Sequence, residues 1–583
     1  TFKVPRVVGA QMEPRSGIGE YDPKEERFIV TAGNQGVHRY RDMIASALKA
    51  KPDKVRVICP DVGGGFGSRG HVGPEYVILA WAAKRLSRPV KWTSTRVEAF
   101  ISDWQGRDMQ MNGEIGLNKD GLITAYKLQV LINIGAYTIC YAPPANVSRL
   151  ITTTYDIPTA SLDLQVYLSN TVPVLPFRAA GRPETHLVLE RLIDMGARKI
   201  GMDRKAVRLK NLIPQHAMPF KTVMGLTYDV GSYPEALEGV ADIMKYDDFE
   251  ARRTQSNANG KLRGISLIPF IESPVGAPFE MGRVEISADG QATIFAGTQN
   301  HGQGHETTYP QVISELLGIP YEDITMAWGD SMLLARGGGT HSDRSMRMMG
   351  TVLYEISKEL VKIAKPVAAH LLQADESAIE FVNGKFKIKT TGQETDMQEV
   401  AAVYAEFSGS SNPLMFEYFQ KGRIKAFPYG ASAAEVEIDP DTGDMTICRY
   451  GIVDDCGQAV NPMIVHGQTH GGIVQGAGQA MGECAYFDLA SGQLLTGSFM
   501  DYMMPRADQF PMFDIGTMEV ASETNPLRIK AGGEAGTVPA LAVIANAVMD
   551  ALSPYGIEHF DMPYTAPRIW SEIKKSKTKY NHF

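Results

Sequence analysis

Apolar and polar positions along the chain follow two spacings, one typical of strands and the other typical of helices. A short apolar run at 55–59 predicts a buried strand, and the run at 74–86 predicts a helix. Asp120-Gly121 separates two long stretches, 109–117 and 122–134, and indicates a hairpin turn between them. Strands and helices alternate in a mixed order, so we expect an α+β (mixed α/β) fold.

Three further helices are predicted downstream. One follows Pro183, which suits a first helical turn, and carries four apolar residues on one side: Val188, Leu189, Leu192 and Ile193. A long helical run ends at Leu372, and an apolar one extends over 539–552.

A duplicated unit occupies the second half of the chain. Residues 284–305 give a strand, a turn, a second strand and an H-G-Q-G-H segment that we expect to open a helix. Residues 436–470 repeat this order and end in H-G-Q-T-H, with His301 and His466 lying 165 positions apart. The repeat predicts two related subdomains around one shared ligand, and a chance resemblance of common hairpins is the alternative.

Length sets the domain organisation. A chain of 583 residues is too long for one core, so several domains are expected. The turn-rich stretch 214–264 indicates a crossing between two large elongated domains, predicted at 1–240 and 241–583. The second domain is predicted to contain the two related subdomains, at about 265–400 and 420–583.

Composition excludes several classes of protein. Hydrophobic residues make up 44% and charged residues 21%, as in ordinary globular proteins. The net charge of -8 argues against a nucleic-acid partner, and the apolar runs are too short for a membrane span. Five cysteines without a CxxC pair favour a reducing, cytoplasmic setting and show no iron–sulfur or zinc spacing.

A glycine-rich loop separates the strand at 55–59 from the helix at 74–86. Residues 65–70 satisfy G-x-G-x-x-G, the dinucleotide-binding fingerprint. The next strand ends at Thr95-Arg96 without the acid that would hold a ribose, which disfavours a Rossmann site. The glycines before Phe66 still leave backbone N–H groups open to a ligand.

Two more segments carry polar candidates among small residues. Arg178 precedes Ala179, Ala180 and Gly181, so it either leans over a flat or anionic ligand or pairs with Glu184. Residues 337–345 place glycines, hydroxyls and an arginine before a helix, which favours a phosphate group over a simple helix cap.

The histidine pairs of the repeat invite a metal interpretation, because their spacing is i, i+4. Intervening glycines weaken the helix that would align them, and no nearby acid completes a ligand set. Gln303 and Gln468, whose amides donate and accept hydrogen bonds, are better candidates for binding a polar cofactor.

Glu534 is the candidate acid–base residue. It stands in Gly532-Gly533-Glu534-Ala535-Gly536, where small neighbours let a large ligand approach the backbone. A carboxylate in such a place can serve as a general base, whereas a solvated glycine turn is the alternative.

Together these motifs resemble the molybdopterin-binding large subunit of the xanthine dehydrogenase, aldehyde oxidase and aerobic carbon monoxide dehydrogenase family. The matching segments run in the family's order: G-G-G-F-G at 63–67, F-R-A-A-G-R-P-E at 177–184, G-T-Q-N-H-G-Q-G at 297–304, G-G-G-T-H-S-D-R-S at 337–345, G-Q-T-H-G-G-I-V-Q-G at 467–476 and G-G-E-A-G at 532–536. The family's N-terminal part has no counterpart, so we expect a preceding segment or a separate chain to supply it.

The resemblance implies roles for individual residues. Glu534 falls on the catalytic base, and Arg178 lies on the loop that faces the substrate side of the metal. The resemblance places the following residues at the cofactor: Gly64, Gly65, Phe66, Gly67, Ala179, Ala180, Arg208, His301, Gly302, Gln303, His341, Ser342, Asp343, Arg344, Ser345, Gln468 and Gly533. No side chain of this chain is expected to ligate the molybdenum, which the pterin holds.

The resemblance also implies the reaction and the partners. We expect oxidative hydroxylation of an electron-poor carbon with water-derived oxygen, a molybdenum cofactor in its cytosine dinucleotide form, and a dimer of heterotrimers. A [2Fe-2S] small subunit and an FAD-binding medium subunit would take up the electrons. A catalytically silent scaffold of the same complex is the alternative.

Two departures from the family narrow the substrate. Ala179 stands where carbon monoxide oxidisers carry cysteine, and Gly70 stands where purine hydroxylases carry glutamate. An aldehyde or another N-heteroaromatic compound therefore remains as the expected substrate.

Overall fold

One structural unit recurs four times in the protein. The computed structural model describes residues 1–580 and confirms the mixed α and β fold. Each unit contains an antiparallel hairpin, a helix, a strand that pairs in parallel with the second hairpin strand, and a further helix.

The units follow one another along the chain. Unit 1 contains β3 (Ser16–Asp22), β4 (Arg27–Ala32), α1 (Val37–Leu48), β5 (Val55–Ile58) and α2 (Pro74–Leu86). Unit 2 contains β8 (Met109–Leu117), β9 (Ile123–Asn133), α4 (Ala142–Arg149), β10 (Ala160–Tyr167) and α5 (Arg182–Ile200). Unit 3 contains β14 (Phe279–Ile286), β15 (Ala292–Ala296), α9 (His305–Leu317), β16 (Ile324–Ala327) and α10 (Ser345–Leu371). Unit 4 contains β21 (Tyr429–Ile438), β22 (Met445–Asp455), α12 (Pro462–Met481), β23 (Asp514–Met518) and α13 (Thr537–Ala551).

A fourth strand completes each sheet by pairing antiparallel with the first hairpin strand. These edge strands are β6 (Val90–Thr93), β1 (Phe2–Val4), β20 (Leu414–Lys421) and β13 (Leu262–Ile271) for units 1 to 4. All four sheets therefore share one strand order.

Other elements connect the units or extend them. They are β2 (Val7–Val8), α3 (Arg96–Ser102), β7 (Gln105–Gly106), α6 (Arg204–Asn211), β11 (Phe220–Lys221), β12 (Thr227–Tyr228), α7 (Tyr233–Met244), α8 (Phe249–Ala258), β17 (Ile379–Val382), β18 (Lys385–Ile388), β19 (Glu394–Asp396), α11 (Met397–Ser408) and α14 (Ala566–Tyr580). Across residues 1–580, none of the helices has both the length and the apolar character needed to cross a bilayer.

The predicted repeat corresponds to units 3 and 4, and both of its hairpins are confirmed. The first H-G-Q-x-H segment does open a helix, because α9 begins at His305. The expectation for the second segment is wrong, since α12 begins at Pro462 and already contains His466. Asn461 caps that helix by accepting from the Ile464 N–H at 3.2 Å, and Pro462 favours the first turn.

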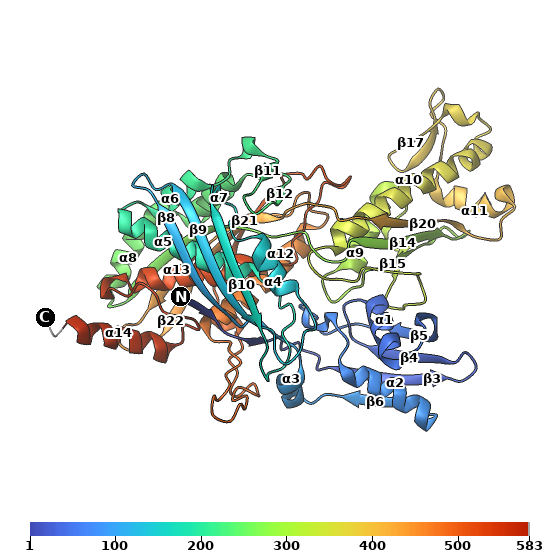
Figure 1. Ribbon diagram of the computed structural model, residues 1–583. Helices are drawn as coiled ribbons and strands as arrows, with labels where there is room; N and C mark the ends of the chain where they lie inside the picture. Colours follow the sequence, from blue (N-terminus) through green and yellow to red (C-terminus); the bar gives the residue numbers. More distant parts are fainter. Residues whose placement is uncertain (581–583) are drawn as a thin grey trace.

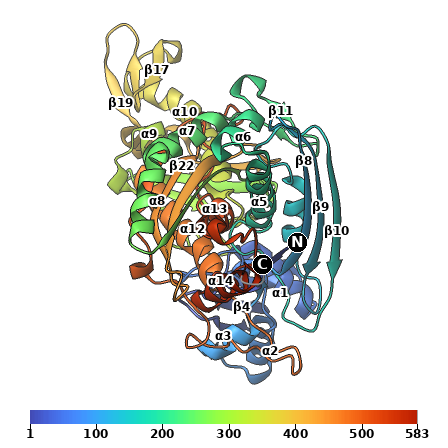
Figure 2. The same ribbon diagram turned by 90° about the vertical axis from the view of Figure 1, so that its left-hand side faces the viewer.

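Units 2 and 4 share the largest hydrophobic core, while units 1 and 3 have cores of their own. Helices α5 and α13 pack against each other between the sheets of units 2 and 4 (Figures 1 and 2). Units 1 and 3 meet where the Cys59 N–H donates to the Gly329 carbonyl at 2.6 Å. The shared core draws residues from both sides of position 240, so the domain division predicted there stays a prediction.

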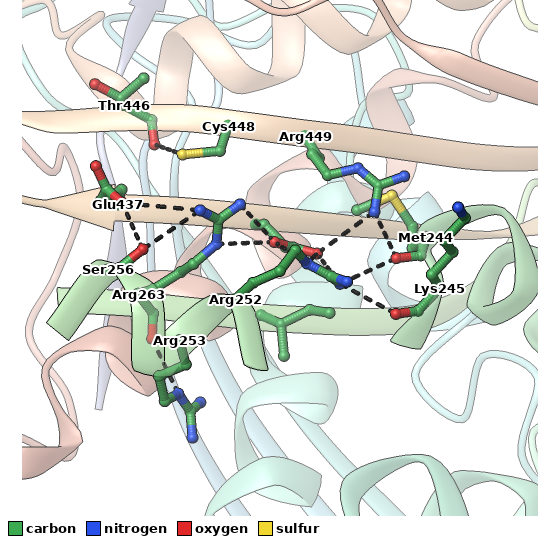
Figure 3. Close-up of polar contacts among 12 residues, drawn as sticks. Met244, Lys245, Arg252, Arg253, Ser256, Arg263, Glu437, Thr446, Cys448 and Arg449 are labelled. Carbon is green, nitrogen blue, oxygen red and sulfur yellow. Dashed lines mark hydrogen bonds and ion pairs between the residues drawn. The ribbon is translucent and has the colours of Figure 1, made fainter. Parts of the chain in front are cut away.

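Partly buried arginines hold the segment that joins the two halves through hydrogen bonds and ion pairs (Figure 3). Arg252 of α8 donates to the Met244 and Lys245 carbonyls at 3.1 Å, and Arg449 of β22 donates to the Met244 carbonyl at 2.6 Å. Arg252 and Arg263 also pair with the fully buried Glu435, at 2.5 and 2.8 Å. Such pairing compensates the cost of burying a carboxylate and fixes α7 and α8 against the sheet of unit 4.

Candidate functional site

Eight loops, two from each unit, converge on one cavity of about 1360 Å³. The first loop of a unit follows the second hairpin strand, and these loops are 33–36, 134–141, 297–304 and 456–461. The second loop follows the parallel strand, and these loops are 59–73, 168–181, 328–344 and 519–536. Both loops leave the carboxyl ends of parallel neighbours, which lie at the same edge of a sheet, where α/β proteins commonly bind ligands.

Most of the predicted site residues line this cavity. They are Gly65, Phe66, Gly67, Arg178, Ala180, His301, Gly302, Gln303, His341, Ser342, Asp343, Arg344, Ser345, Gln468, Gly533 and Glu534. Two further predicted residues lie next to the lining residues. Gly64 is beside Phe66 in the loop 59–73, and the Ala179 N–H donates a hydrogen bond to Glu534. The sequence motifs, which span most of the chain, are therefore brought together in space.

Arg208 is the exception. It lies on α6, and its guanidinium nitrogens are 2.7 Å from carboxylate oxygens of Glu190 and Asp194 on α5. All three side chains are buried, so Arg208 neutralises two interior carboxylates and does not reach the cavity. The prediction that Arg208 binds the cofactor is therefore wrong.

The glycine-rich loop of unit 1 is held in a conformation that brings its backbone to the cavity. Gly67 has φ of 103°, and a Cβ there would lie 2.2 Å from the Pro176 carbonyl oxygen. Phe66 has φ of 48° and is 41% exposed. The Gln35 side chain accepts hydrogen bonds from the N–H groups of Gly67 (2.9 Å) and Arg69 (3.2 Å). Gln35 was missed in the sequence because it belongs to no motif.

Arg178 does not pair with Glu184, which instead lies 3.4 Å from Arg107. Its Nε donates to the Gly533 carbonyl at 2.8 Å, and its Nη2 donates to the Gln468 carbonyl at 2.9 Å and to Gln468 Oε1 at 3.1 Å. Arg178 therefore ties the second loops of units 2 and 4 to helix α12, directly beside Glu534.

Glu534 projects into the cavity with one oxygen fixed and the other free. Its Oε1 accepts from the Ala179 N–H at 2.9 Å. Its Oε2 is buried without a hydrogen-bond partner and lies 3.8 Å from Nη1 of Arg182. The side chain is 17% exposed and lines the cavity, whereas Oε2 itself is buried.

The histidines of the cavity are uncharged at neutral pH. Burial lowers the pKa of His301 to about 4 and that of His341 to about 3. His305, the second member of the pair, stacks on Tyr309 with ring centroids 4.8 Å apart. Within residues 1–580, one group of side chains has metal-ligand spacing, and it contains no histidine: Glu272, Asp343 and Glu534.

Arg344 holds the loop at 328–344 in place through hydrogen bonds. Its Nη1 donates to Glu280 at 2.6 Å and to the Gly339 carbonyl at 2.5 Å, and the side chain is fully buried. The guanidinium thus lines the cavity with its charge already neutralised. Ser342 and His341 hydrogen bond to each other at 3.0 Å.

The two glutamines differ in how their amides are used. Gln303 Oε1 accepts from the His301 N–H at 2.5 Å, and its Nε2 donates to the Gln299 carbonyl at 3.2 Å. Gln468 Oε1 accepts from Arg178, which leaves its amide NH₂ for a ligand.

The residues present fit a large polar cofactor. The cavity exceeds the usual range of small-molecule pockets, and a Cβ at Gly302, which lines it, would meet nothing within 4 Å, so this glycine leaves room for a ligand's approach. Four polar atoms at the cavity are buried without partners: His301 Nε2, His305 Nε2, Asp343 Oδ2 and Glu534 Oε2. Buried polar atoms are costly when unpaired, so their arrangement indicates a polar ligand.

Comparison with known proteins also indicates a large polar cofactor. Residues 1–212 and 239–511 match families of molybdopterin cofactor-binding domains. The carbon monoxide dehydrogenase large chain of Hydrogenophaga pseudoflava is 31% identical over 98% of this chain and 74% of its own length. The nicotine 6-hydroxylase large subunit of Paenarthrobacter nicotinovorans is 32% identical over 97% of this chain and 72% of its own length.

The fold has a close counterpart among solved structures. The crystal structure of a Cu,Mo-CO dehydrogenase superposes with a TM-score of 0.94 at 29% identity, covering 99% of this chain and 76% of the other.

Proposed function

We propose that this chain, which belongs to the molybdenum hydroxylase large-subunit family and is a molybdenum-dependent oxidoreductase, hydroxylates an electron-poor carbon of an aldehyde or N-heteroaromatic compound. The observation that carries the proposal is Glu534, which lines the cavity with Oε1 fixed by the Ala179 N–H and with Oε2 lacking a hydrogen-bond partner. This is the geometry of a base that is oriented before the substrate arrives.

The cofactor would lie between the glycine loop of unit 1 and the loops of unit 3. Gly65–Gly67 and Gly302 would approach it through their backbone, and Gln303, Ser342 and Gln468 would contact it through side chains. When bound, the molybdenum cofactor supplies two-electron oxidation and an oxygen that derives from water.

The chain's own residues position and move a proton. Glu534 Oε2 accepts the proton from the reacting oxygen, while the Ala179 N–H keeps hold of Oε1. Arg178 fixes the Gly533 carbonyl, and therefore the backbone that presents Glu534. The limited exposure of these groups keeps bulk water away from the base.

The substrate class rests on two positions. Ala179 provides no thiol, which disfavours carbon monoxide as the substrate. Gly70 has no side chain, so no acid at this position can contact a purine. The likeness to a nicotine 6-hydroxylase large subunit supports an N-heteroaromatic substrate.

The partners and the form of the cofactor belong to the same proposal. Relatives named as large chains and large subunits support a multi-subunit complex. We propose a [2Fe-2S] small subunit, an FAD-binding medium subunit, a cytosine dinucleotide cofactor and a cytoplasmic dimer of heterotrimers.

The test is metal analysis and reduction of the purified complex. We expect molybdenum in the protein and substrate-dependent bleaching of the visible iron–sulfur and flavin absorption with an aldehyde or an N-heterocycle. Absence of molybdenum would contradict the proposal. Molybdenum without bleaching by any member of a broad panel would favour a silent scaffold.

A further inference from the structure

Three carboxylates from distant parts of the chain meet beside the cavity, which two of them line. Glu272 follows strand β13, Asp343 precedes helix α10, and Glu534 precedes helix α13. One oxygen from each lies within 4.8 Å of the other two. The reaction proposed above uses only Glu534, so the other two acids need their own explanation.

Each of these carboxylates has a buried oxygen without a hydrogen-bond partner. These atoms are Glu272 Oε2, Asp343 Oδ2 and Glu534 Oε2. The Glu272 side chain is fully buried, and its other oxygen accepts from the Ser273 N–H at 2.6 Å. Ionised carboxylates only accept hydrogen bonds, so three of them cannot satisfy one another, whereas protonated neighbours can donate.

The positive charge around the cluster offsets only part of the cost of burying three ionised acids. Arg182 lies 2.5 Å from Glu272 and 3.8 Å from Glu534. Arg178 also faces the cluster, but its donors are committed to Gly533 and Gln468. Arg347, which is fully buried on α10, faces Asp343, and the charge of Arg107 acts on Glu534.

Burial and like charge favour protons on two of the acids. Burial, with a further contribution from the charge of Glu534, raises the pKa of Asp343. Burial raises the pKa of Glu272 well above its usual range, although Arg182 opposes the shift. Adjacent carboxyl groups that share protons titrate as one system. Arg182 already supplies a cation here, so the cluster favours protons over a metal ion.

We propose that Asp343 and Glu272 are positioning residues that stay protonated and hold Glu534 ionised, with Asp343 donating its O–H to Glu534 Oε2. The proposal rests on Glu534 as the base of the proposed function. When Glu534 accepts a proton from the reacting oxygen, the cluster holds three protons. It returns to two when Glu534 releases that proton to cavity water, while Asp343 and Glu272 keep theirs.

The pH profile of kcat tests this role in the complete complex. In the wild type, ionisation of Asp343 at alkaline pH removes its donor and adds a negative charge beside Glu534, so kcat falls. In Asp343→Asn the amide still donates and cannot ionise, so the alkaline fall disappears. In Asp343→Ala the donor is lost, and at pH values below the alkaline fall kcat drops about ten- to a hundredfold relative to the wild type, as expected for a hydrogen bond to a charged group.

Asp454→Asn is the matched control. Asp454 is also buried, which raises its pKa to about 7, but it lies outside the cavity and accepts from Thr469. This variant keeps the alkaline fall. Persistence of the fall in Asp343→Asn, or equal kcat values for the Asn and Ala variants, would overturn the proposal.

Infrared spectroscopy provides a readout that does not depend on turnover. The protein without substrate should show a carboxylic acid C=O band that Asp343→Asn removes, and Glu272→Gln should remove a second one. Loss of neither band overturns the cluster even if Glu534→Gln is inactive. If both bands are present but no substrate is turned over, the cluster stands and the proposed function fails.

Discussion

The first and second loops of the four units lie at the same edges of their sheets but differ in backbone strain and in charge. Each second loop contains a non-glycine residue with positive φ: Phe66 (48°), Ala179 (64°), Ser342 (55°) and Arg528 (59°). Across residues 1–580, the first loops contain no such residue. The second loops also carry Arg178, Asp343 and Glu534, whereas the first loops contribute amides and the neutral His301.

This difference indicates a division of roles between the first and the second loops. A strained backbone persists only where the surroundings impose it, and it commonly marks functional segments. The first loops support the second loops, as Gln35 does for the glycine loop, and the second loops present the reactive groups. Three substitutions test this division, and a fourth, outside both sets of loops, is expected to change stability without affecting the reactive groups.

Replacing Glu534 with Gln should have the largest effect. The amide cannot accept a proton, so kcat should fall by about 10²–10⁴-fold, while molybdenum content stays near that of the wild type. Steady-state kinetics and metal analysis measure the two quantities. Glu523→Gln, an exposed position in the same loop, is the control and should keep full activity. An active Glu534→Gln enzyme would refute the assignment of the base.

Replacing Gly67 with Ala should come next. Both its φ of 103° and the 2.2 Å approach of a Cβ to the Pro176 carbonyl oppose a side chain, so we expect a loss of at least about 1–3 kcal/mol and lower cofactor content. Gly70→Ala, where a Cβ would meet nothing within 4 Å, is the control in the same loop. Thermal unfolding and metal analysis compare the two. Equal stability of both variants would remove the argument from strain.

Replacing Gln35 with Ala tests the support from a first loop. The change leaves the Gly67 and Arg69 N–H groups without their acceptor, which should cost about 1–3 kcal/mol. Activity should fall less than in Glu534→Gln, because no reactive group is lost. Gln215→Ala, an exposed position, serves as the control in thermal unfolding. A drop in kcat as large as that of the base variant would contradict the division.

Replacing Glu483 with Gln should have the smallest effect and should change stability alone. Burial raises the pKa of Glu483 to about 8, and Tyr502 donates to its Oε2 at 2.9 Å. Because the folded-state pKa is raised, the folded protein binds the extra proton between about pH 4 and 8, so stability falls as pH rises through this range. The slope is at most about 1.4 kcal/mol per pH unit, and the variant should remove it. Thermal unfolding across pH would show an unchanged slope if Glu483 were already ionised.

Local pattern predicted much of the fold and of the site. Hairpins with Asp-Gly turns and the apolar helix at 539–552 were visible because their residues are neighbours in sequence. The repeat was found only in units 3 and 4, since units 1 and 2 preserve its strand order without its H-G-Q-x-H segment. The predicted start of α12 at the H-G-Q-T-H segment was wrong, because Asn461 and Pro462 begin the helix before that segment.

Long-range contacts account for what the sequence did not reveal. Glu272 has no motif around it, and it follows β13, whose pairing with β21 brings it close to Asp343 and Glu534. The family resemblance predicts that Arg208 binds the cofactor. In the structure it pairs with the buried Glu190 and Asp194, which lie on successive turns of another helix, α5. Which charges compensate one another depends on packing, and packing is not encoded in local spacing.

The core shared by units 2 and 4 has a consequence for the order of folding. The ring centroids of Phe2 and His559 lie 4.6 Å apart, and α5 packs on α13, so this core forms through contacts between residues far apart in sequence. Such contacts form slowly, because a long loop must close before they stabilise the protein. Glu534 lies three residues before α13, so the candidate base takes its place in the cavity only when this long-range core has formed.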